Sequence, residues 1–327
     1  MGTFESQNTR AGLISLVVSI VLLAVKFYAY ELTHSTAVLS DALESIVNVV
    51  AAGLALWVLH YITQPADHEH PYGHGKMEYF SAAFEGGLIF FAAIAVFIEA
   101  GKALLSPKAP EELEMGLAVI AAAALFNLLL GIYLKKIGRK NNSSALEASG
   151  SHVLSDVWTT IGVILGLALV KISGWLWVDP FVSLLIAVQL GWTGVNIIRT
   201  AASGLMDEQD EKLSAEFCEA INKCRMPGVI NIHNLRMIRS GNFQHIDAHI
   251  VIPEFWDVAE GHEATHEFEK QVMKAYPFDG EIAFHVDPCK KKYCRNCDLQ
   301  ECPIRRHAFE KLIISTPESI RQGPVYV

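Results

Sequence analysis

The pattern of apolar residues divides the chain into a long hydrophobic part and a shorter polar part. Long, mostly apolar runs recur before residue 205, at 11–30, 37–60, 80–101, 115–134, 146–171 and 177–199. A helix of about 20 apolar residues spans the roughly 30 Å hydrocarbon core of a bilayer. The pattern therefore predicts an α-helical membrane protein with six transmembrane helices.

The polar remainder predicts a small α+β domain. Residues 210–224 and 259–276 have helical periodicity, whereas 228–241 and 243–254 alternate like strands around a Gly-Asn turn. A third strand is expected at 280–288. The order α-β-β-α-β is typical of a ferredoxin-like sheet with helices on one face. We therefore predict three parts, namely a membrane domain (1–205), a cytoplasmic domain (206–288) and a cysteine-rich tail (289–327).

Composition and charge narrow the class of protein. The 327 residues are 51% hydrophobic and carry a net charge of −9. Acidic residues outnumber basic ones in both parts, 15 to 11 before residue 206 and 20 to 15 after it. A nucleic acid partner is therefore excluded. The first ten residues lack the basic region of a secretory leader, so no cleaved signal peptide is predicted.

The basic residues near the ends of the spans predict the orientation. Those on the side of the two termini are Arg10, Lys76, Lys135, Lys136, Arg139, Lys140 and Arg199. The opposite side has Lys102, Lys108 and Lys171. Because cytoplasmic loops carry the excess of Lys and Arg, both termini are expected in the cytoplasm. The chain is thus predicted to be a multi-pass protein of the inner (cytoplasmic) membrane.

Polar residues inside two spans form the strongest candidate site. Glu44 and Asn48 lie four residues apart in the second run, and His152 and Asp156 share that spacing in the fifth. Each pair lies on one helical face, although such groups are costly to insert into a membrane. Facing each other, the pairs would offer four ligands to a divalent ion such as Zn²⁺, Fe²⁺, Co²⁺ or Mn²⁺. The alternative is a set of interhelical hydrogen bonds.

Four further acidic residues lie in or beside the spans. Asp41 is either a second-sphere or proton-relay group or part of a solvated helix end. Glu85 and Glu99 either line a cavity or make structural pairs. Asp179, which precedes a proline, is predicted to cap the sixth helix and to need no functional explanation.

Histidines and carboxylates outside the spans suggest two more metal sites. Asp67, His70 and His74 lie close together in the loop after the second span, where a solvated polar loop is the alternative. The cytoplasmic domain offers a second candidate set: His233, His249, His262, His285 and Asp287. The strand pattern places His233 and His249 on neighbouring strands and His285 and Asp287 on one face of a third.

The tail contains a cysteine motif of the form C-x4-C-x2-C-x4-C. Its members are Cys289, Cys294, Cys297 and Cys302. Cytoplasmic thiols with this spacing suggest a four-thiolate site, with zinc the default ion and an iron–sulfur cluster the alternative. The remaining interpretation is free thiols on a mobile tail. Cys218 and Cys224, on a predicted helix, are expected to be packing residues.

Taken together, these motifs resemble those of the cation diffusion facilitator family of metal/proton exchangers. The matching stretches are "SDALESIVN", "HVLSD", "PADHEHPYGHGK", "IHNLR", "DAHI" and "HVDP". The resemblance implies a homodimer in which each protomer moves a divalent ion by alternating access, driven by inward proton flow. It assigns transport to the four intramembrane ligands and places further metal sites on the loop set and the cytoplasmic set. It also implies that Lys76 pairs with Asp207.

The sequence departs from the family pattern at Glu44 and Asn48, where members usually have His or Asp followed by Asp. The hypothesis is efflux of a divalent transition metal from the cytoplasm. The ligand types put Zn²⁺ first, Fe²⁺ next because of the oxygen-rich site, and then Mn²⁺ or Co²⁺. One alternative is a metal-sensing membrane receptor that transports nothing. Another is a metalloenzyme, because His262–His266 reads H-E-x-x-H. No further ligand is evident in the sequence, so the chain is not predicted to be an enzyme.

Overall fold

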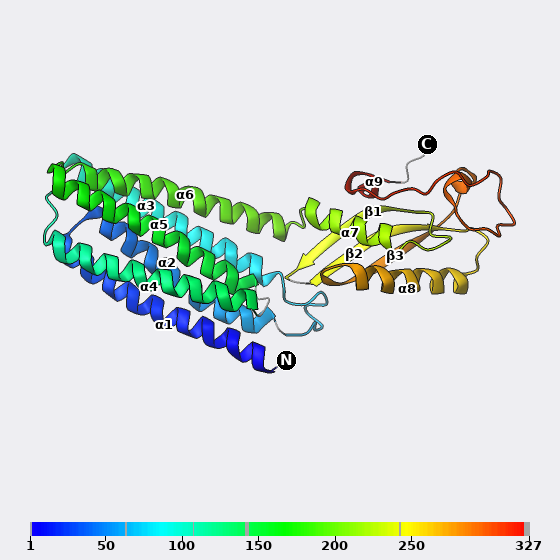
Figure 1. Ribbon diagram of the computed structural model, residues 1–327, viewed down its shortest axis with the longest axis horizontal. Coiled ribbons are helices and arrows are strands. Elements are labelled where there is room, and N and C mark those ends of the chain that lie inside the picture. The colour runs from blue at the N-terminus through cyan, green and yellow to red at the C-terminus, as the bar shows by residue number, and fades with distance from the viewer. Residues whose placement is uncertain (1, 63, 107, 141–143, 242, 324–327) are drawn as a thin grey trace. The chain divides into compact units, whose positions relative to one another are not determined.

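The computed structural model describes residues 2–62, 64–106, 108–140, 144–241 and 243–323. The chain folds into two compact units (Figure 1). The first contains Met1–Thr63 and Met77–Ala202, and the second contains Gln64–Lys76 and Ser203–Val327. The loop after the second apolar run therefore groups with the polar half of the chain, and each unit has its own hydrophobic core.

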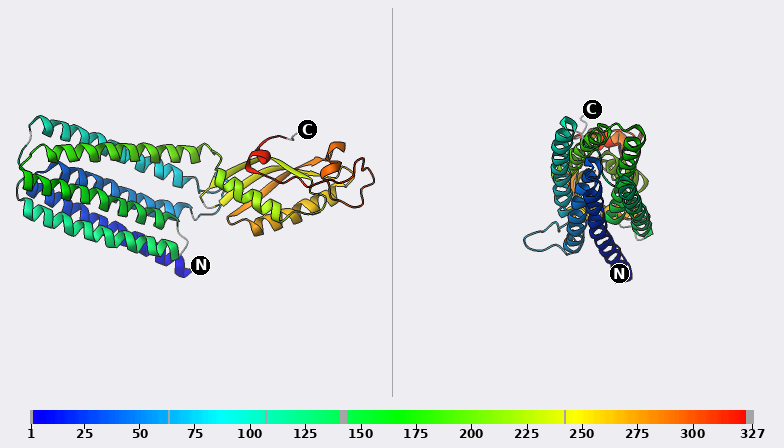
Figure 2. Two further views of the ribbon diagram at one scale, coloured as in Figure 1. Left: turned by 45° about the horizontal axis from the view of Figure 1, so that its top comes forward. Right: turned by 90° about the vertical axis from the view of Figure 1, so that its left-hand side faces the viewer.

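Six helices that run side by side form the first unit (Figures 1 and 2). They are α1 (Gly2–Thr33), α2 (Thr36–Ile62), α3 (Met77–Leu105), α4 (Leu113–Lys140), α5 (Ser144–Ser173) and α6 (Val178–Leu205). All six are long and apolar enough to cross a membrane. Large apolar side chains such as Phe91, Trp158 and Trp192 are exposed on the bundle, where lipid would cover them. The prediction of a multi-pass helical membrane protein is confirmed.

Close helix packing fixes the position of α5. A Cβ atom on Gly150 would lie 2.9 Å from the Gly131 carbonyl oxygen and 2.7 Å from the Lys135 backbone nitrogen. Only glycine allows this approach between α4 and α5. Helix α1 packs against both α2 and α4, and α2 contacts α5. The polar positions of α2 and α5 are therefore held in the interior of the bundle.

Asp179 caps a helix other than the one predicted. Helix α6 begins at Val178, so Asp179 lies inside its first turn. Its carboxylate instead accepts hydrogen bonds from the backbone N–H groups of Thr36 and Ala37, at 2.9 and 3.3 Å, and from the Ser35 hydroxyl at 2.5 Å. The predicted cap of the sixth helix was wrong. The carboxylate instead satisfies the first turn of α2 across the bundle.

The second unit contains the predicted α-β-β-α-β order. Its elements are α7 (Glu211–Lys223), β1 (Asn231–Ser240), β2 (Phe243–Ile252), α8 (Val258–Ala275) and β3 (Asp279–Pro288). Strand β2 is central, antiparallel to β1 and parallel to β3. The hairpin turn contains Gly241 at φ 64°, and Asn242 lies outside the described residues. The predicted α+β domain is confirmed.

The sheet has one face buried under helices. Ile246 and Ile250 of β2 pack with Phe217 of α7 and with Phe268 and Val272 of α8. Because side chains alternate along a strand, the odd-numbered positions of β2 lie on the opposite face. That second face carries the histidines considered below.

The tail beyond β3 is packed against the domain. It contains a short 3₁₀ turn (Lys291–Asn296) and helix α9 (Pro317–Arg321). Ile320 of α9 is fully buried in the core between the sheet and its helices. Tyr293 and Cys297 are also buried, in a cluster with Ile230 and Val251. The expectation that the thiols belong to a mobile tail therefore does not fit this packing.

Candidate metal sites

The polar positions of α2 and α5 meet inside the bundle. The Asn48 amide nitrogen donates a hydrogen bond to Asp156 Oδ2 at 2.6 Å. That orientation leaves Asn48 Oδ1 as an acceptor, so His152 Nε2 donates to it at 3.2 Å. The i, i+4 spacing on each helix thus brings three of the four predicted donors into direct contact.

The fourth donor, Glu44, lies one turn before Asn48 on α2. The Thr159 hydroxyl oxygen is 3.3 Å from Glu44 Oε2 and 2.8 Å from the Asp156 carbonyl oxygen. Both carboxylates are buried, with Glu44 5% and Asp156 2% exposed. Two buried carboxylates, an imidazole and an amide are a donor set that a divalent transition-metal ion accepts, and the ion would offset their charge.

An ion pair that sequence reasoning missed lies beside these donors. Lys26 Nζ is 2.9 Å from Asp41 Oδ1, and both side chains are 1% exposed. The Thr160 hydroxyl donates to the same carboxylate oxygen at 2.8 Å. A lysine alone in an apolar run was the available signal, because such residues are rare unless paired. The solvated helix end considered for Asp41 is therefore wrong.

A cavity of about 440 Å³ reaches this site from one end of the bundle. Asn48 and His152 line it, whereas Glu44 and Asp156 do not. Its wall also includes Ile62, Glu78 and Ser149, which mark the end where α2 stops and α3 and α5 start. Solvent at that end can therefore reach the imidazole.

Glu85 belongs to the same cavity, whereas Glu99 does not. Glu85 lines the cavity and its Oε1 lies 3.9 Å from His152 Nε2. Glu99 is exposed and pairs with Lys102 at 2.6 Å. Of the two roles considered for these glutamates, Glu85 has the cavity-lining one and Glu99 the structural pair.

The structure also brings together the three donors predicted in the loop. Asp67 Oδ1 lies 3.2 Å from His70 Nδ1, and Asp67 Oδ2 lies 3.5 Å from His74 Nε2. The backbone N–H groups of His70 and Glu69 donate to Asp67 and lower the pKa of its carboxyl group. The carboxylate is thus ionised and directed toward two imidazoles, one of them buried.

Three histidines form a row across the sheet. His233 of β1 is opposite His249 of β2, which is opposite His285 of β3. Asp287 joins them, with Oδ2 3.0 Å from His249 Nδ1 and 3.3 Å from His233 Nε2, and Oδ1 3.7 Å from His285 Nε2. A break in the β1 register between His233 and Arg236 keeps the row aligned. We call His233, His249, His285 and Asp287 the histidine row.

His233 is the most deeply buried member of the row. Its side chain is 3% exposed, and within the described part of the chain its Nδ1 atom has no hydrogen-bond partner. Burial lowers the pKa of its imidazole, with Asp287 acting in the opposite direction. A neutral imidazole is the form that binds metal. His262, on α8, instead stacks on His266 and is not brought to the row.

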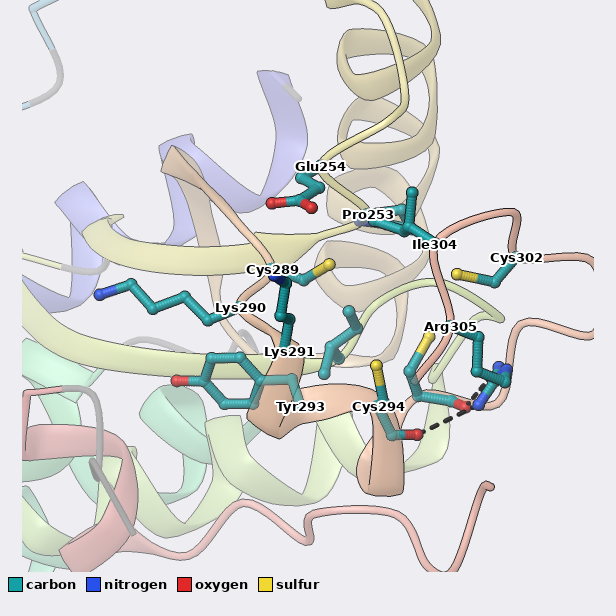
Figure 3. A pocket seen from close by; sticks show the side chains of 12 residues that line it. Pro253, Glu254, Cys289, Lys290, Lys291, Tyr293, Cys294, Cys302, Ile304 and Arg305 are labelled. Atoms are coloured by element: carbon teal, nitrogen blue, oxygen red, sulfur yellow. Dashed lines mark hydrogen bonds between the residues drawn. The ribbon is translucent and has the colours of Figure 1, made fainter. Parts of the chain in front are cut away.

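The four tail cysteines line one pocket (Figure 3). Cys289, Cys294, Cys297 and Cys302 are free thiols around this pocket. Among the described residues, the groups whose donor atoms lie within 4.8 Å of one another are the loop set and three members of the histidine row, without His285. The four thiols are not among them, so their sulfur atoms are spread more widely. Burial raises the pKa of the Cys289 and Cys297 thiols.

The two remaining cysteines lie elsewhere. Cys218 is buried in the core between the sheet and its helices, which confirms it as a packing residue. Burial raises the pKa of its thiol to about 11. Cys224 donates to the Gln271 carbonyl oxygen at 3.3 Å. Neither lines the tail pocket.

Comparison with known proteins identifies the family. The family model described as the cation efflux transmembrane domain matches residues 12–206. The chain belongs to the cation diffusion facilitator family. The cytoplasmic domain of cation efflux proteins matches residues 209–289. An uncharacterized transporter of Synechocystis sp. is 34% identical over 278 residues, covering 84% of this chain and 88% of the relative.

Two bacterial pumps are also similar to this cation diffusion facilitator. The cation-efflux pump FieF of Shewanella oneidensis is 27% identical over 274 residues, with 84% of this chain and 92% of the pump covered. FieF of Yersinia pestis is 28% identical over 282 residues, with 85% and 92% covered. Family members are transporters, not enzymes. Lys76 Nζ lies 2.8 Å from Asp207, which confirms the pairing that the resemblance implied.

Proposed function

We propose that this transporter exports a divalent transition-metal cation from the cytoplasm in exchange for protons, by alternating access. The transport ligands in this proposal are Glu44, Asn48, His152 and Asp156. The proposed setting is the inner membrane, with both termini in the cytoplasm and two copies of the chain forming a homodimer. Membership of the family supports cation efflux, and the geometry of the site supports the choice of transport ligands. The distribution of Lys and Arg supports the orientation. The match to the cytoplasmic domain of cation efflux proteins supports the homodimer.

The observation that carries the proposal is the cavity that ends at His152 and Asn48. It leads from one end of the bundle to the exposed side of the donor set, while Asp156 and Glu44 lie behind that wall. An ion entering the cavity would meet the imidazole and the amide first and the buried carboxylates next. The loops at this end of the bundle carry more Lys and Arg residues than those at the other end, which favours a cytoplasmic opening of the cavity.

The hydrogen bonds of the site support exchange of metal for protons. His152 Nε2 carries a hydrogen atom that it donates to Asn48 Oδ1. A metal ion needs the lone pair of that nitrogen, so the proton must leave or move to Nδ1 when the ion binds. The reverse step, protonation of His152 and the carboxylates, would release the ion. Alternating access then requires only that the two bundle states bind ion and protons differently.

The ligand types favour Zn²⁺, with Fe²⁺ next and Mn²⁺ or Co²⁺ after them. One imidazole and three oxygen donors suit all four ions, and a tetrahedral set favours zinc. Asn48 supplies a neutral oxygen where relatives of this family carry a carboxylate. The site therefore binds one proton fewer when it is empty.

The cytoplasmic unit would sense metal and support the dimer. In the loop set, donor atoms of Asp67, His70 and His74 lie within 4.8 Å of one another. In the histidine row, those of three members do so: His233, His249 and Asp287. Ions bound there stabilise whichever arrangement of the unit binds them best. His262 lies away from the row in its own chain, so a role for it as a ligand would require another copy of the protein.

The test is metal uptake into inside-out vesicles with an imposed pH gradient, measured for Zn²⁺, Fe²⁺, Mn²⁺ and Co²⁺. A double variant, His152→Ala with Asp156→Ala, should lose uptake of every ion. Glu99→Ala is the matched control, because this glutamate lies in the same bundle and outside the cavity.

Uptake that persists in the double variant at the wild-type rate would exclude this site as the transport pathway. Equilibrium metal binding without flux in the wild type would instead favour the metal-sensing receptor. Uptake at the wild-type rate in Glu99→Ala would show that a substitution in the bundle does not by itself abolish transport.

A further inference from the structure

We propose that Cys289, Cys294, Cys297 and Cys302 hold one Zn²⁺ ion, which fastens the tail to the open face of the cytoplasmic sheet. This site is independent of transport, because its ligands lie outside the membrane bundle. Four thiolates are the ligand set of structural zinc sites.

The four side chains converge on one place. They come from the end of β3, the 3₁₀ turn and the loop beyond it, and all line one pocket (Figure 3). The labelled sulfur atoms of Cys289, Cys294 and Cys302 point toward its centre. The free space is about 20 Å³, which is room for one water-sized atom. A single ion fits this space.

One of the sulfur atoms accepts a hydrogen bond from the backbone. The Arg306 amide donates to Cys294 Sγ at 3.5 Å. Hydrogen bonds of this kind stabilise sulfur in its charged form and orient metal-bound thiolates. Cys294 therefore has the kind of supporting contact that a thiolate site needs.

Arg305 holds the loop in place. Its guanidinium group donates to the carbonyl oxygens of Cys294 and Cys297, both at 3.1 Å, and to that of Leu299. These bonds hold the backbone so that the thiols remain on the pocket side. Four thiolates around Zn²⁺ carry a net charge of −2, and the cations of Arg305 and Lys291 border the pocket.

The segment has little regular secondary structure. Between β3 and α9 the chain contains no helix or strand in its described residues apart from the 3₁₀ turn. Yet Tyr293 and Cys297 are buried against Ile230 and Val251. Small structural units that lack a large core commonly add a disulfide or a structural metal. No disulfide serves here, because all six cysteines are free thiols in the structure.

Binding of a zinc ion would contract the pocket. Zn–S bonds of about 2.3 Å place the four sulfur atoms about 3.8 Å apart. The thiols are spread more widely than that in the structure, so the ion would draw the loop of Cys302 toward β3. Val251 lies two residues beyond His249 on β2, so the tail and the histidine row share one face of the sheet. The proposed zinc ion therefore stabilises the part of the sheet face that lies beside the histidine row.

The experiment uses the full-length protein, purified under reducing, anaerobic conditions. Zinc and iron are measured per chain in the wild type, in Cys294→Ser with Cys297→Ser, and in the control Cys224→Ala. We expect the double variant to contain about one zinc fewer per chain, and the control to match the wild type. Cobalt substitution of the wild type gives a second readout that needs no variant, because thiolate ligands produce strong sulfur-to-cobalt charge-transfer absorption.

Two results would overturn the proposal. One is wild-type protein that takes up Co²⁺ without any charge-transfer absorption, since the histidine and carboxylate sites do not produce it. The other is iron with acid-labile sulfide in place of zinc, which would identify a cluster. Neither readout depends on flux, so a failure of the transport proposal leaves this test intact.

Discussion

The membrane site and the histidine row use similar donors in opposite ways. In the bundle, Asn48 bridges His152 and Asp156, so these donors are satisfied by one another without metal. In the sheet, both ring nitrogens of His233 are buried without a hydrogen-bond partner among the described residues, including Nε2, which faces Asp287. An unsatisfied buried group makes the empty state costly, whereas internally bonded donors make it cheap. The first site is thus suited to releasing an ion and the second to retaining one.

The largest expected effect concerns the charges that keep the membrane site stable. Lys26→Met leaves Asp41 buried without its partner, which costs about 3–5 kcal/mol of folding free energy. We expect a large drop in the thermal unfolding temperature of the purified protein. Adding Asp41→Leu to Lys26→Met should restore much of the stability, because no uncompensated charge then remains.

The exposed pair Lys171–Glu114 is the control for that prediction. Lys171→Met should change the stability by less than about 1 kcal/mol, since exposed ion pairs contribute little. Equal effects of the two lysine variants would show that the buried pair has no special role in the bundle.

The next effect separates retention from transport. His249→Ala removes the central member of the histidine row, so the part of the stabilisation by metal that comes from the row should disappear. At a metal concentration 100 times the dissociation constant, that stabilisation is about 2.7 kcal/mol. Thermal unfolding with and without Zn²⁺ measures it, and the flux should continue.

His245→Ala is the control on the same strand, because His245 pairs with Glu281 outside the row. Loss of all metal flux in His249→Ala, with folded protein present, would show that the two sites do not have the separate roles described here.

A third change makes the membrane site more like a retaining site. Asn48→Asp introduces a carboxylate beside His152 and Asp156, which should tighten metal binding about tenfold or more and slow release. The concentration dependence and maximal rate of uptake measure both effects. Glu99→Ala, outside the cavity, should alter neither.

The smallest effect is a dependence of stability on pH. Because burial lowers the pKa of His233, the folded protein binds its proton less readily than the unfolded chain. As the pH falls through about 6.5, the ordinary pKa of histidine, the unfolded chain takes up a proton that the folded protein does not. The folded state therefore loses stability with falling pH until the pH reaches the lower pKa of His233 in the folded protein. The slope is at most about 1.4 kcal/mol per pH unit.

Unfolding of the metal-free cytoplasmic unit at pH 7 and pH 5 measures this slope. His233→Gln should reduce it, whereas His266→Gln, at an exposed position on α8, should not. An unchanged slope in His233→Gln would place the titrating group elsewhere.

Much of the fold follows from local patterns. The six spans could be predicted because each apolar run is long enough to cross a bilayer, and the hairpin because Gly241 supplies the left-handed turn. The capping of α2 by Asp179 could not be predicted in this way. It joins residues more than 140 positions apart, so it depends on packing that no local pattern encodes.

The candidate sites were partly accessible from the sequence. Spacing on two helices was enough to bring Asn48, His152 and Asp156 together. The alignment of His249 with His285 required the parallel register of β2 and β3, which a run of residues does not reveal. The pairing of Lys26 with Asp41 could not be predicted, because a single charge in a span does not identify the group that neutralises it.

The central claim is that His152 and Asp156 exchange a metal ion for protons. Its most direct test is to load proteoliposomes with a pH-sensitive dye and to follow Zn²⁺ and protons together after a zinc gradient is imposed. The account predicts proton movement opposite to the zinc, with both fluxes lost in His152→Ala with Asp156→Ala. Zinc flux with no proton movement, or coupled flux that survives in the double variant, would contradict it.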